Sequence, residues 1–143
     1  SRRGHVSTTL PSGKVLVVGG YTEEAAGQKT ALQSALLIDI TAGTYQTRPT
    51  LLKTPRFGAT LQLLAKEILI CGGFGPGPSY APIADCELFS PDDNLAPIGD
   101  PVPLPRARGG HVAVKLETDQ VLLIGGVGEG NRAVSAIDLY TVR

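Results

Sequence analysis

Short apolar runs separated by turn residues recur along the whole chain. The runs are about four to seven residues long and rich in Val, Ile and Leu, which is typical of strands rather than helices. The first third of the chain predicts strands at Val6–Leu10, Lys14–Val18, Ala35–Ile40 and Thr44–Thr47. The middle third predicts strands at Ala59–Leu64, Glu67–Cys71, Asp85–Phe89 and, as a weaker run, near Leu95–Ile98. The last third predicts strands at Val112–Leu116, Gln120–Ile124 and Ala136–Thr141, without a fourth.

One motif returns three times. The second run of each third ends in two glycines, as KVLVVGG, EILICGG and QVLLIGG, and these doublets are 53 residues apart (72 − 19 and 125 − 72). Each doublet is preceded by a related string, RRGH, RFGA or RGGH. The common period predicts three repeats, at 1–53, 54–105 and 106–143, which together form part of one domain. The doublets are Gly19-Gly20, Gly72-Gly73 and Gly125-Gly126.

The second strand of each repeat is apolar on consecutive positions, so both of its faces must be covered. Radial stacking of four-stranded sheets provides such cover, and this architecture is a propeller. The expected fold is therefore all-β: a propeller fragment of nearly three four-stranded antiparallel blades. Two glycines at a strand end allow a positive φ and the close approach of a neighbouring backbone, so we assign the six doublet glycines to structure.

The repeat resembles the kelch repeat. The resemblance lies in the order of the motifs: R-x-G-H, an apolar strand, G-K-V-L-V-V-G-G, a long loop and a strand such as AIDLY. It implies a kelch-type propeller that acts as a non-catalytic interaction module, needs no cofactor and binds a protein partner through its long loops. The same resemblance leaves two alternatives open. One is part of a propeller enzyme of the galactose-oxidase type, acting on a carbohydrate with copper and a Cys–Tyr crosslink, and the other is a purely structural repeat segment.

Composition and charge exclude several functions. The 18 glycines and 11 prolines are scattered between the runs and indicate many tight turns. Thirteen basic residues balance thirteen acidic ones, so no electrostatic footprint for nucleic acid is present. No apolar run approaches the roughly 20 residues that a membrane helix needs. The chain starts at Ser1 and contains no Met, which favours a processed product or an excised fragment.

Motifs for catalysis or metal binding are weak. The string GGVGEGNR has Asn131 where the dinucleotide fingerprint requires glycine, and no helix pattern follows it. His5 and His111 occupy the same position in two repeats, which favours a structural role for both. The histidines and cysteines lack the short spacings of a zinc site, so we expect neither a metal nor a catalytic centre. Cys71 and Cys86 lie in adjacent strands of one repeat and are close enough to pair, although buried free thiols are the favoured expectation.

Binding is expected where long loops leave a rigid scaffold. In an up-and-down blade, the turns after the first and third strands lie at one end, and the other connections lie at the opposite end. In this sequence the first kind is short and the second kind is long. The long ones are Tyr21–Ser34, Arg48–Gly58, Phe74–Ala84, Gly99–Gly110 and Val127–Ser135. The arginines Arg2, Arg56 and Arg108 precede the first strands and either bind backbone carbonyls, which we favour, or face a ligand. The candidate binding residues are Tyr21, Glu23, Arg56, Tyr80, Arg108, Glu129, Asn131 and Arg132.

Fewer than three complete blades cannot close a ring of the usual size. Both end blades would then expose an apolar face, and such a face indicates a missing partner. The expected cover is either the remainder of a longer chain, which we favour, or another copy of this one.

Overall fold

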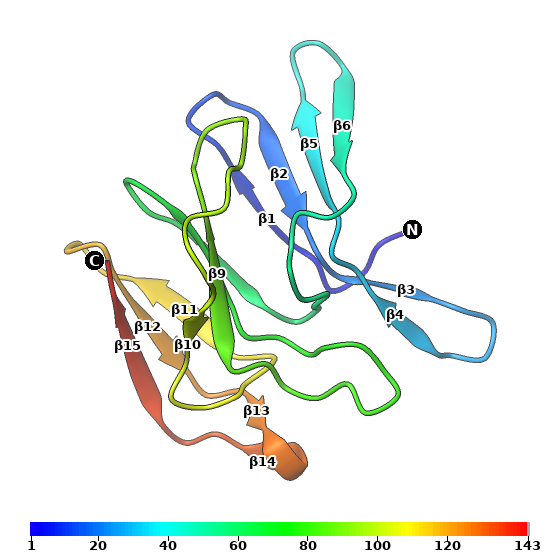
Figure 1. Ribbon diagram of the computed structural model, residues 1–143, viewed down its shortest axis with the longest axis vertical. Helices are drawn as coiled ribbons and strands as arrows, with labels where there is room; N and C mark the ends of the chain where they lie inside the picture. The colour runs from blue at the N-terminus through cyan, green and yellow to red at the C-terminus, as the bar shows by residue number, and fades with distance from the viewer. Residues whose placement is uncertain (143) are drawn as a thin grey trace.

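The computed structural model describes residues 1–142, and these form three antiparallel sheets in succession, which we call blades 1, 2 and 3 (Figure 1). Blade 1 has the strand order β1-β2-β5-β6, with β1 at Val6–Thr9, β2 at Val15–Val18, β5 at Ala35–Asp39 and β6 at Thr44–Arg48. Blade 2 contains β7 at Thr60–Leu63, β8 at Ile68–Cys71, β9 at Asp85–Phe89 and β10 at Val102–Pro103. Blade 3 has three strands, β11 at Val112–Lys115, β12 at Gln120–Ile124 and β15 at Ile137–Thr141. The chain is therefore all-β, as predicted.

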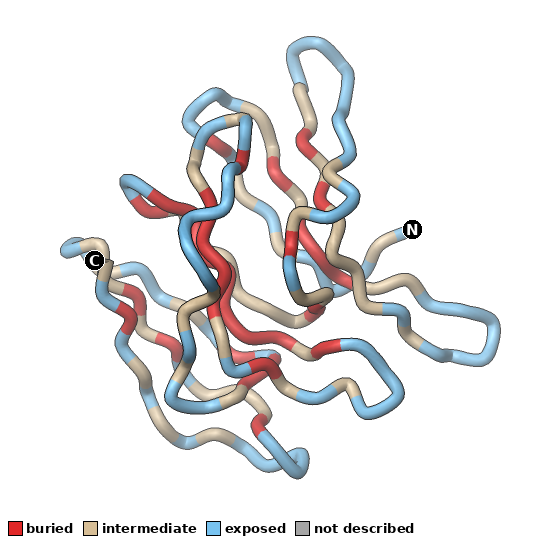
Figure 2. Tube along the Cα trace, in the orientation of Figure 1, coloured by how far each residue is buried: buried red, intermediate tan, exposed pale blue. Residues whose placement is uncertain are grey.

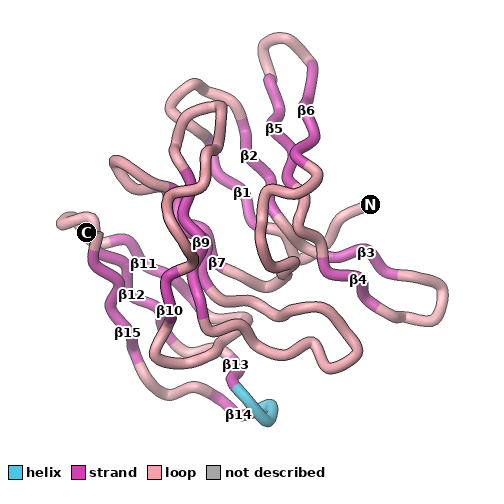
Figure 3. The backbone as a smooth tube through the Cα atoms, viewed as in Figure 1, coloured by secondary structure: helices cyan, strands magenta, loops and turns pink. Residues whose placement is uncertain are grey.

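Two small hairpins project from the blades. One pairs β3 (Tyr21–Glu23) with β4 (Lys29–Ala31), and the other pairs β13 (Val127–Gly128) with β14 (Arg132–Ala133). A single 3-10 turn at Glu129–Asn131 connects β13 to β14 (Figure 3). No helix within residues 1–142 is long and apolar enough to cross a membrane.

The fourth strand of the second repeat was predicted only in part. Pro97 of the predicted run Leu95–Ile98 forms an isolated antiparallel bridge with Phe89 of β9. The fourth strand itself is Val102–Pro103, which pairs with Cys86 and Asp85 of β9. Leu95 instead has a positive φ of 53° and lies fully buried in the core between blades 1 and 2. Leu95 belongs to a turn, and its apolar side chain nevertheless packs into the core. A buried apolar residue is therefore not part of a strand at this position.

Blade 2 is covered on both faces. Ile68 and Ile70 of β8 join the core cluster shared with blade 1, whereas Leu69 and Cys71 join the cluster shared with blade 3. All four residues of β8 are buried, which explains its consecutive apolar positions. Burial is concentrated along this middle blade, while the outer blades are largely intermediate or exposed (Figure 2).

The glycine doublets connect successive blades. The amide of Gly20 donates to the Arg56 carbonyl at 2.8 Å, and the amide of Gly73 donates to the Arg108 carbonyl at 2.8 Å. A Cβ on Gly19, whose φ is 65°, would lie 2.6 Å from the Arg56 carbonyl oxygen. A Cβ on Gly72 would also overlap the Arg108 carbonyl oxygen. Glycine is required here because the backbone of the next blade occupies the space of a side chain.

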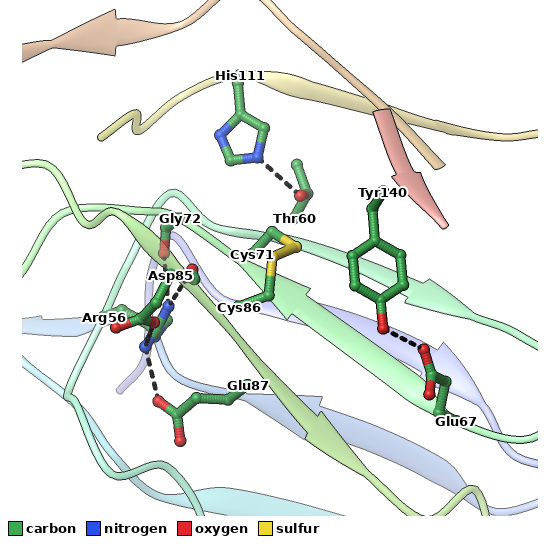
Figure 4. The surroundings of a disulfide bond; sticks show 10 residues. All are labelled: Arg56, Thr60, Glu67, Cys71, Gly72, Asp85, Cys86, Glu87, His111 and Tyr140. Atoms are coloured by element: carbon green, nitrogen blue, oxygen red, sulfur yellow. Dashed lines mark hydrogen bonds and ion pairs between the residues drawn. A yellow bond between two sulfur atoms is a disulfide. The ribbon is translucent and has the colours of Figure 1, made fainter. Parts of the chain in front are cut away.

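Cys71 and Cys86 form a disulfide bond, so the expectation of free thiols was wrong (Figure 4). The two residues are direct partners in the β8–β9 register, and their Cα atoms are 4.0 Å apart. Directly paired residues on neighbouring strands point to the same face of a sheet, which brings the two sulfur atoms together. Both cysteines are buried against blade 3, in the second core cluster.

Candidate functional site

The long connections between the second and third strands of each blade gather at one end of the blades, whereas the long connection 90–101 between β9 and β10 lies at the other end, beside the short turns (Figure 1). The β3–β4 hairpin, the segment 74–84 and the β13–β14 hairpin all lie at the first end, which we call the long-loop face. The turns between β1 and β2, between β5 and β6, and between β11 and β12 lie at the opposite end. This arrangement follows from strands that alternate in direction within each blade.

Four aromatic rings form a cluster on the long-loop face. Phe57 lies at its centre, with ring centroids 5.1 Å from Tyr21, 5.5 Å from Phe74 and 5.9 Å from Tyr80. The Tyr21 and Tyr80 rings meet Phe57 edge to face, which is a favourable geometry for aromatic pairs. The cluster therefore brings together two predicted binding residues, Tyr21 and Tyr80, from separate loops.

Lys29 ties the β3–β4 hairpin to this cluster. Its ammonium lies 4.9 Å from the Tyr21 ring centroid and 5.5 Å from that of Phe57, within the range of cation–π attraction. Its backbone amide donates a hydrogen bond to the Tyr80 hydroxyl at 3.0 Å. The two loops are thereby fixed in relation to each other, and the aromatic surface is preorganised.

An open pocket of about 510 Å³ lies between segment 74–84 and the β13–β14 hairpin. Tyr80, Glu129 and Asn131 line it, together with Phe74 and Pro82. A second pocket of about 510 Å³ lies on the other side of this hairpin and is lined by Arg132, Arg106 and Glu129. Glu129, Asn131 and Arg132 are all exposed, so the hairpin presents charges of both signs next to the aromatic cluster.

Glu23 lies on the same face but is already paired. Its carboxylate accepts a hydrogen bond from the Arg3 guanidinium at 2.5 Å, in an exposed ion pair. Exposed pairs of this kind contribute little to stability, about 0–1 kcal/mol, so Glu23 can exchange this partner for another.

Arg56 and Arg108 lie apart from this surface. The Arg56 guanidinium donates to the Gly72 and Asp85 carbonyls and forms ion pairs with Asp85 at 2.8 Å and Glu87 at 2.6 Å (Figure 4). Its side chain is 1% exposed. Arg108 is bound in the same way, to carbonyls of blade 3 and to the Asp138 carboxylate. Each guanidinium thus satisfies carbonyls at the ends of the second and third strands of its own blade, which leaves neither exposed to a ligand.

Arg2 repeats this arrangement without an acid. It donates to the Gly19 carbonyl at 2.6 Å and to the carbonyl and hydroxyl of Ser34, both at 2.9 Å. Leu36 stands where Glu87 and Asp138 stand in the other repeats. Partial burial lowers the pKa of Arg2 from its ordinary value, since no carboxylate offsets the desolvation.

The two histidines differ in their surroundings. His5 is exposed, whereas His111 is buried between blades 2 and 3, where its Nε2 hydrogen-bonds with the Thr60 hydroxyl at 2.9 Å (Figure 4). A Cβ on Gly72 would lie 2.8 Å from the His111 ring. Burial, reinforced by the nearby Arg108 charge, lowers the pKa of His111 to about 4, so the ring is neutral at physiological pH. Within residues 1–142, no group of three or more His, Cys, Asp or Glu side chains is arranged to hold a metal ion.

Phe57 and Phe74 were missing from the predicted binding set, whereas Lys29 lies in Tyr21–Ser34, one of the long connections where binding was expected. A signal for the two phenylalanines was present in the repeat itself: the residue after each glycine doublet pairs with the residue after each repeat arginine. The observed bridges are Arg3–Tyr21, Phe57–Phe74 and Gly109–Val127. The middle pair is wholly aromatic, which places the cluster between the two long loops that flank it.

No protein-family model matches the chain. Adagio-like protein 3 from Oryza sativa subsp. japonica is 29% identical over 150 residues, a match that covers 96% of this chain and 23% of that protein. The solved structure of YjhT superposes with a TM-score of 0.79 at 12% identity, over 95% of this chain and 48% of that chain. The likeness to YjhT shows the fold, a blade-type β structure. The chain spans about a quarter of the curated relative and about half of the solved one.

Proposed function

We propose that this chain is part of a kelch-type propeller and that its long-loop face binds a protein partner without catalysing a reaction. The observation that carries the proposal is the preorganised aromatic cluster around Phe57, which adjoins the charged β13–β14 hairpin. Aromatic and arginine side chains beside a polar rim are the composition of protein-binding surfaces. The repeat motifs and the similarity to Adagio-like protein 3 support the kelch assignment.

The alternative of a galactose-oxidase-like enzyme lacks its crosslink here. That chemistry requires a cysteine bound to a tyrosine, and Cys71 and Cys86 are bound to each other. Neither sulfur is available for a tyrosine, so the cysteines give no support to a copper site of that type.

A comparison of two charge reversals tests the proposal. Arg132→Glu changes an exposed residue of the long-loop face, whereas the matched control Lys66→Glu changes an exposed residue of the short turn between β7 and β8. The chain is immobilised, captured proteins are quantified by mass spectrometry, and direct binding is then measured with the purified candidate. We expect Arg132→Glu to weaken that binding by about tenfold or more and Lys66→Glu to leave it unchanged. A partner that responds equally to both reversals, or no partner at all, would refute the proposal.

A further inference from the structure

The side of blade 3 that faces away from blade 2 is an apolar surface, which we call the tail face. Two cross-strand rows form it, because directly paired residues share one side of a sheet. The rows are Val114–Leu122–Leu139 and Val112–Ile124–Ile137. Val112, Ile137 and Leu139 are 59%, 60% and 53% exposed, respectively. Six aliphatic side chains without a charge among them form a docking surface rather than a solvated face.

The preceding blades show what covers this surface. The residues that correspond to Leu139 are Leu37 in blade 1 and Leu88 in blade 2, and both are buried by the following blade. The established contacts between blades 1 and 2 and between blades 2 and 3 are thus two copies of one interface. The tail face is therefore one side of a third interface of the same kind.

The backbone of the last glycine doublet gives the same indication. Gly125 has a φ of 69°, close to the 65° of Gly19, yet a Cβ there would meet nothing nearer than the Val134 carbonyl oxygen at 4.0 Å. At Gly19 the carbonyl of Arg56 occupies that space. The Gly126 amide likewise has no arginine carbonyl to bind among residues 1–142, in contrast to Gly20 and Gly73. The doublet is shaped for an arginine carbonyl from another blade.

This chain carries the missing half on blade 1. Its leading segment contains Arg2, Gly4 and His5 at the positions of Arg108, Gly110 and His111, which dock blade 3 onto blade 2. The side of blade 1 that faces away from blade 2, which we call the head face, is apolar and uncharged in its centre. It presents Val15, Val17, Leu36, Ile38 and Tyr45.

A ladder of glycines runs from blade to blade and is open at both ends. The Gly58 amide donates to the Gly4 carbonyl at 3.1 Å, and the Gly110 amide donates to the Gly58 carbonyl at 2.9 Å. The next step of this ladder would join the Gly110 carbonyl to a Gly4 amide. The molecule therefore offers a donor at its head and an acceptor at its tail.

We infer that the tail face of blade 3 binds the head face of blade 1 in a second copy of this chain, so that two copies close one ring. In that ring the Arg2 carbonyl of each copy accepts a hydrogen bond from the Gly126 amide of the other copy. His5 of each copy becomes buried against Gly125 of the other, just as His111 is buried against Gly72 within one chain. The size fits closure by two, because one chain covers 48% of the YjhT structure that it resembles. The inference concerns the flat sides of the blades and is independent of the long-loop face.

Light scattering during size exclusion, over a range of loading concentrations, tests the inference. We expect a dimer of twice 14.9 kDa that does not grow into longer assemblies. Leu139→Asp on the tail face and Ile38→Asp on the head face should each raise the dimer dissociation constant about 100-fold or more. The matched control Ile98→Asp, at an exposed isoleucine of blade 2, should leave the dimer intact. Circular dichroism verifies that each variant is folded.

Several outcomes would overturn the inference. A wild-type monomer at every concentration would mean that another polypeptide, or a further repeat of a longer chain, covers the tail face. A dimer that Leu139→Asp breaks and Ile38→Asp spares would mean that two tail faces pair with each other. Growth into open-ended assemblies would mean that the ring does not close. Should the aspartate variants fail to fold, the milder pair Leu139→Ser and Ile38→Ser replaces them.

Discussion

Blades 2 and 3 are built from the same repeat, yet their second strands have different surroundings. All four residues of β8 are buried, because blade 1 covers one face and blade 3 the other. In β12 only Val121 and Leu123, which face blade 2, are buried. The difference lies in what each strand packs against and not in its own sequence, since both strands are apolar on consecutive positions.

Blade 1 differs from blades 2 and 3 in the surroundings of its leading arginine. Arg56 and Arg108, which lead blades 2 and 3, are enclosed and paired with acids, whereas Arg2 binds only carbonyls and a hydroxyl. The inner boundaries thus combine apolar packing, a carbonyl over the glycine doublet and a buried ion pair. At the outer ends, the glycine doublet of blade 3 lacks an arginine carbonyl among residues 1–142, and the arginine of blade 1 lacks an acid. The three stability predictions below are measured in the Leu139→Asp background, so that assembly does not contribute to stability.

The largest expected effect concerns the buried arginine of blade 2. Arg56→Leu leaves Glu87 buried without its cation and should lower the free energy of unfolding by about 3–5 kcal/mol. Arg2→Leu removes hydrogen bonds from a partly exposed site and should cost about 1 kcal/mol. Urea unfolding measures both. Adding Glu87→Leu to Arg56→Leu should restore part of the loss, and equal losses from the two arginine substitutions would contradict the distinction.

A methyl group added to the doublets separates the inner boundary from the open one. Gly72→Ala places a Cβ onto the Arg108 carbonyl and should destabilise the fold by about 2–4 kcal/mol. Gly125→Ala has open space and should cost about 1–2 kcal/mol, from its positive φ alone. Gly13→Ala, at a φ of 87° in open space, serves as the control for this backbone cost. If Gly125→Ala were as damaging as Gly72→Ala, its surroundings would already be filled within one chain.

A pH dependence is expected at the boundary of blades 2 and 3. Because burial lowers the pKa of His111 to about 4, the unfolded chain takes up a proton between about pH 6.5 and 4 and the folded chain does not. The stability contributed by the neutral ring is present above that window and is lost as the pH falls through it. Relative to His111→Gln, the wild-type ring should lose about 2 kcal/mol between pH 7 and 5. A difference that stays constant over this range would show that His111 is not desolvated in the folded chain.

Local sequence patterns were sufficient for the blades. The period of the doublets and the consecutive apolar positions of the second strands indicate stacked sheets, because only stacking buries both faces of such a strand. The pattern failed at Leu95, where a buried residue belongs to a turn, and at Val102–Pro103, a strand too short to show alternation. A run of apolar residues therefore predicts that the residues are buried more reliably than it predicts that they pair as a strand.

Contacts that depend on the register between strands could not be predicted from the sequence. Cys71 and Cys86 pair because β8 and β9 align them as direct partners, and a shift of one residue would have turned them to opposite faces. The cluster around Phe57 also requires the positions of three separate segments. Glu87 and Asp138 occupy the same position of their repeats, but their role as partners of the repeat arginines depends on how the leading segments fold back.

Amide exchange at Gly126 in the wild-type chain is the most direct measurement of whether blade 3 is docked. The Gly20 and Gly73 amides, bound to arginine carbonyls, provide the internal reference. We predict that Gly126 is protected to a similar degree in the wild-type chain and exchanges rapidly in Leu139→Asp. Rapid exchange of Gly126 in the wild-type chain, with Gly20 and Gly73 still protected, would contradict a second copy on the tail face.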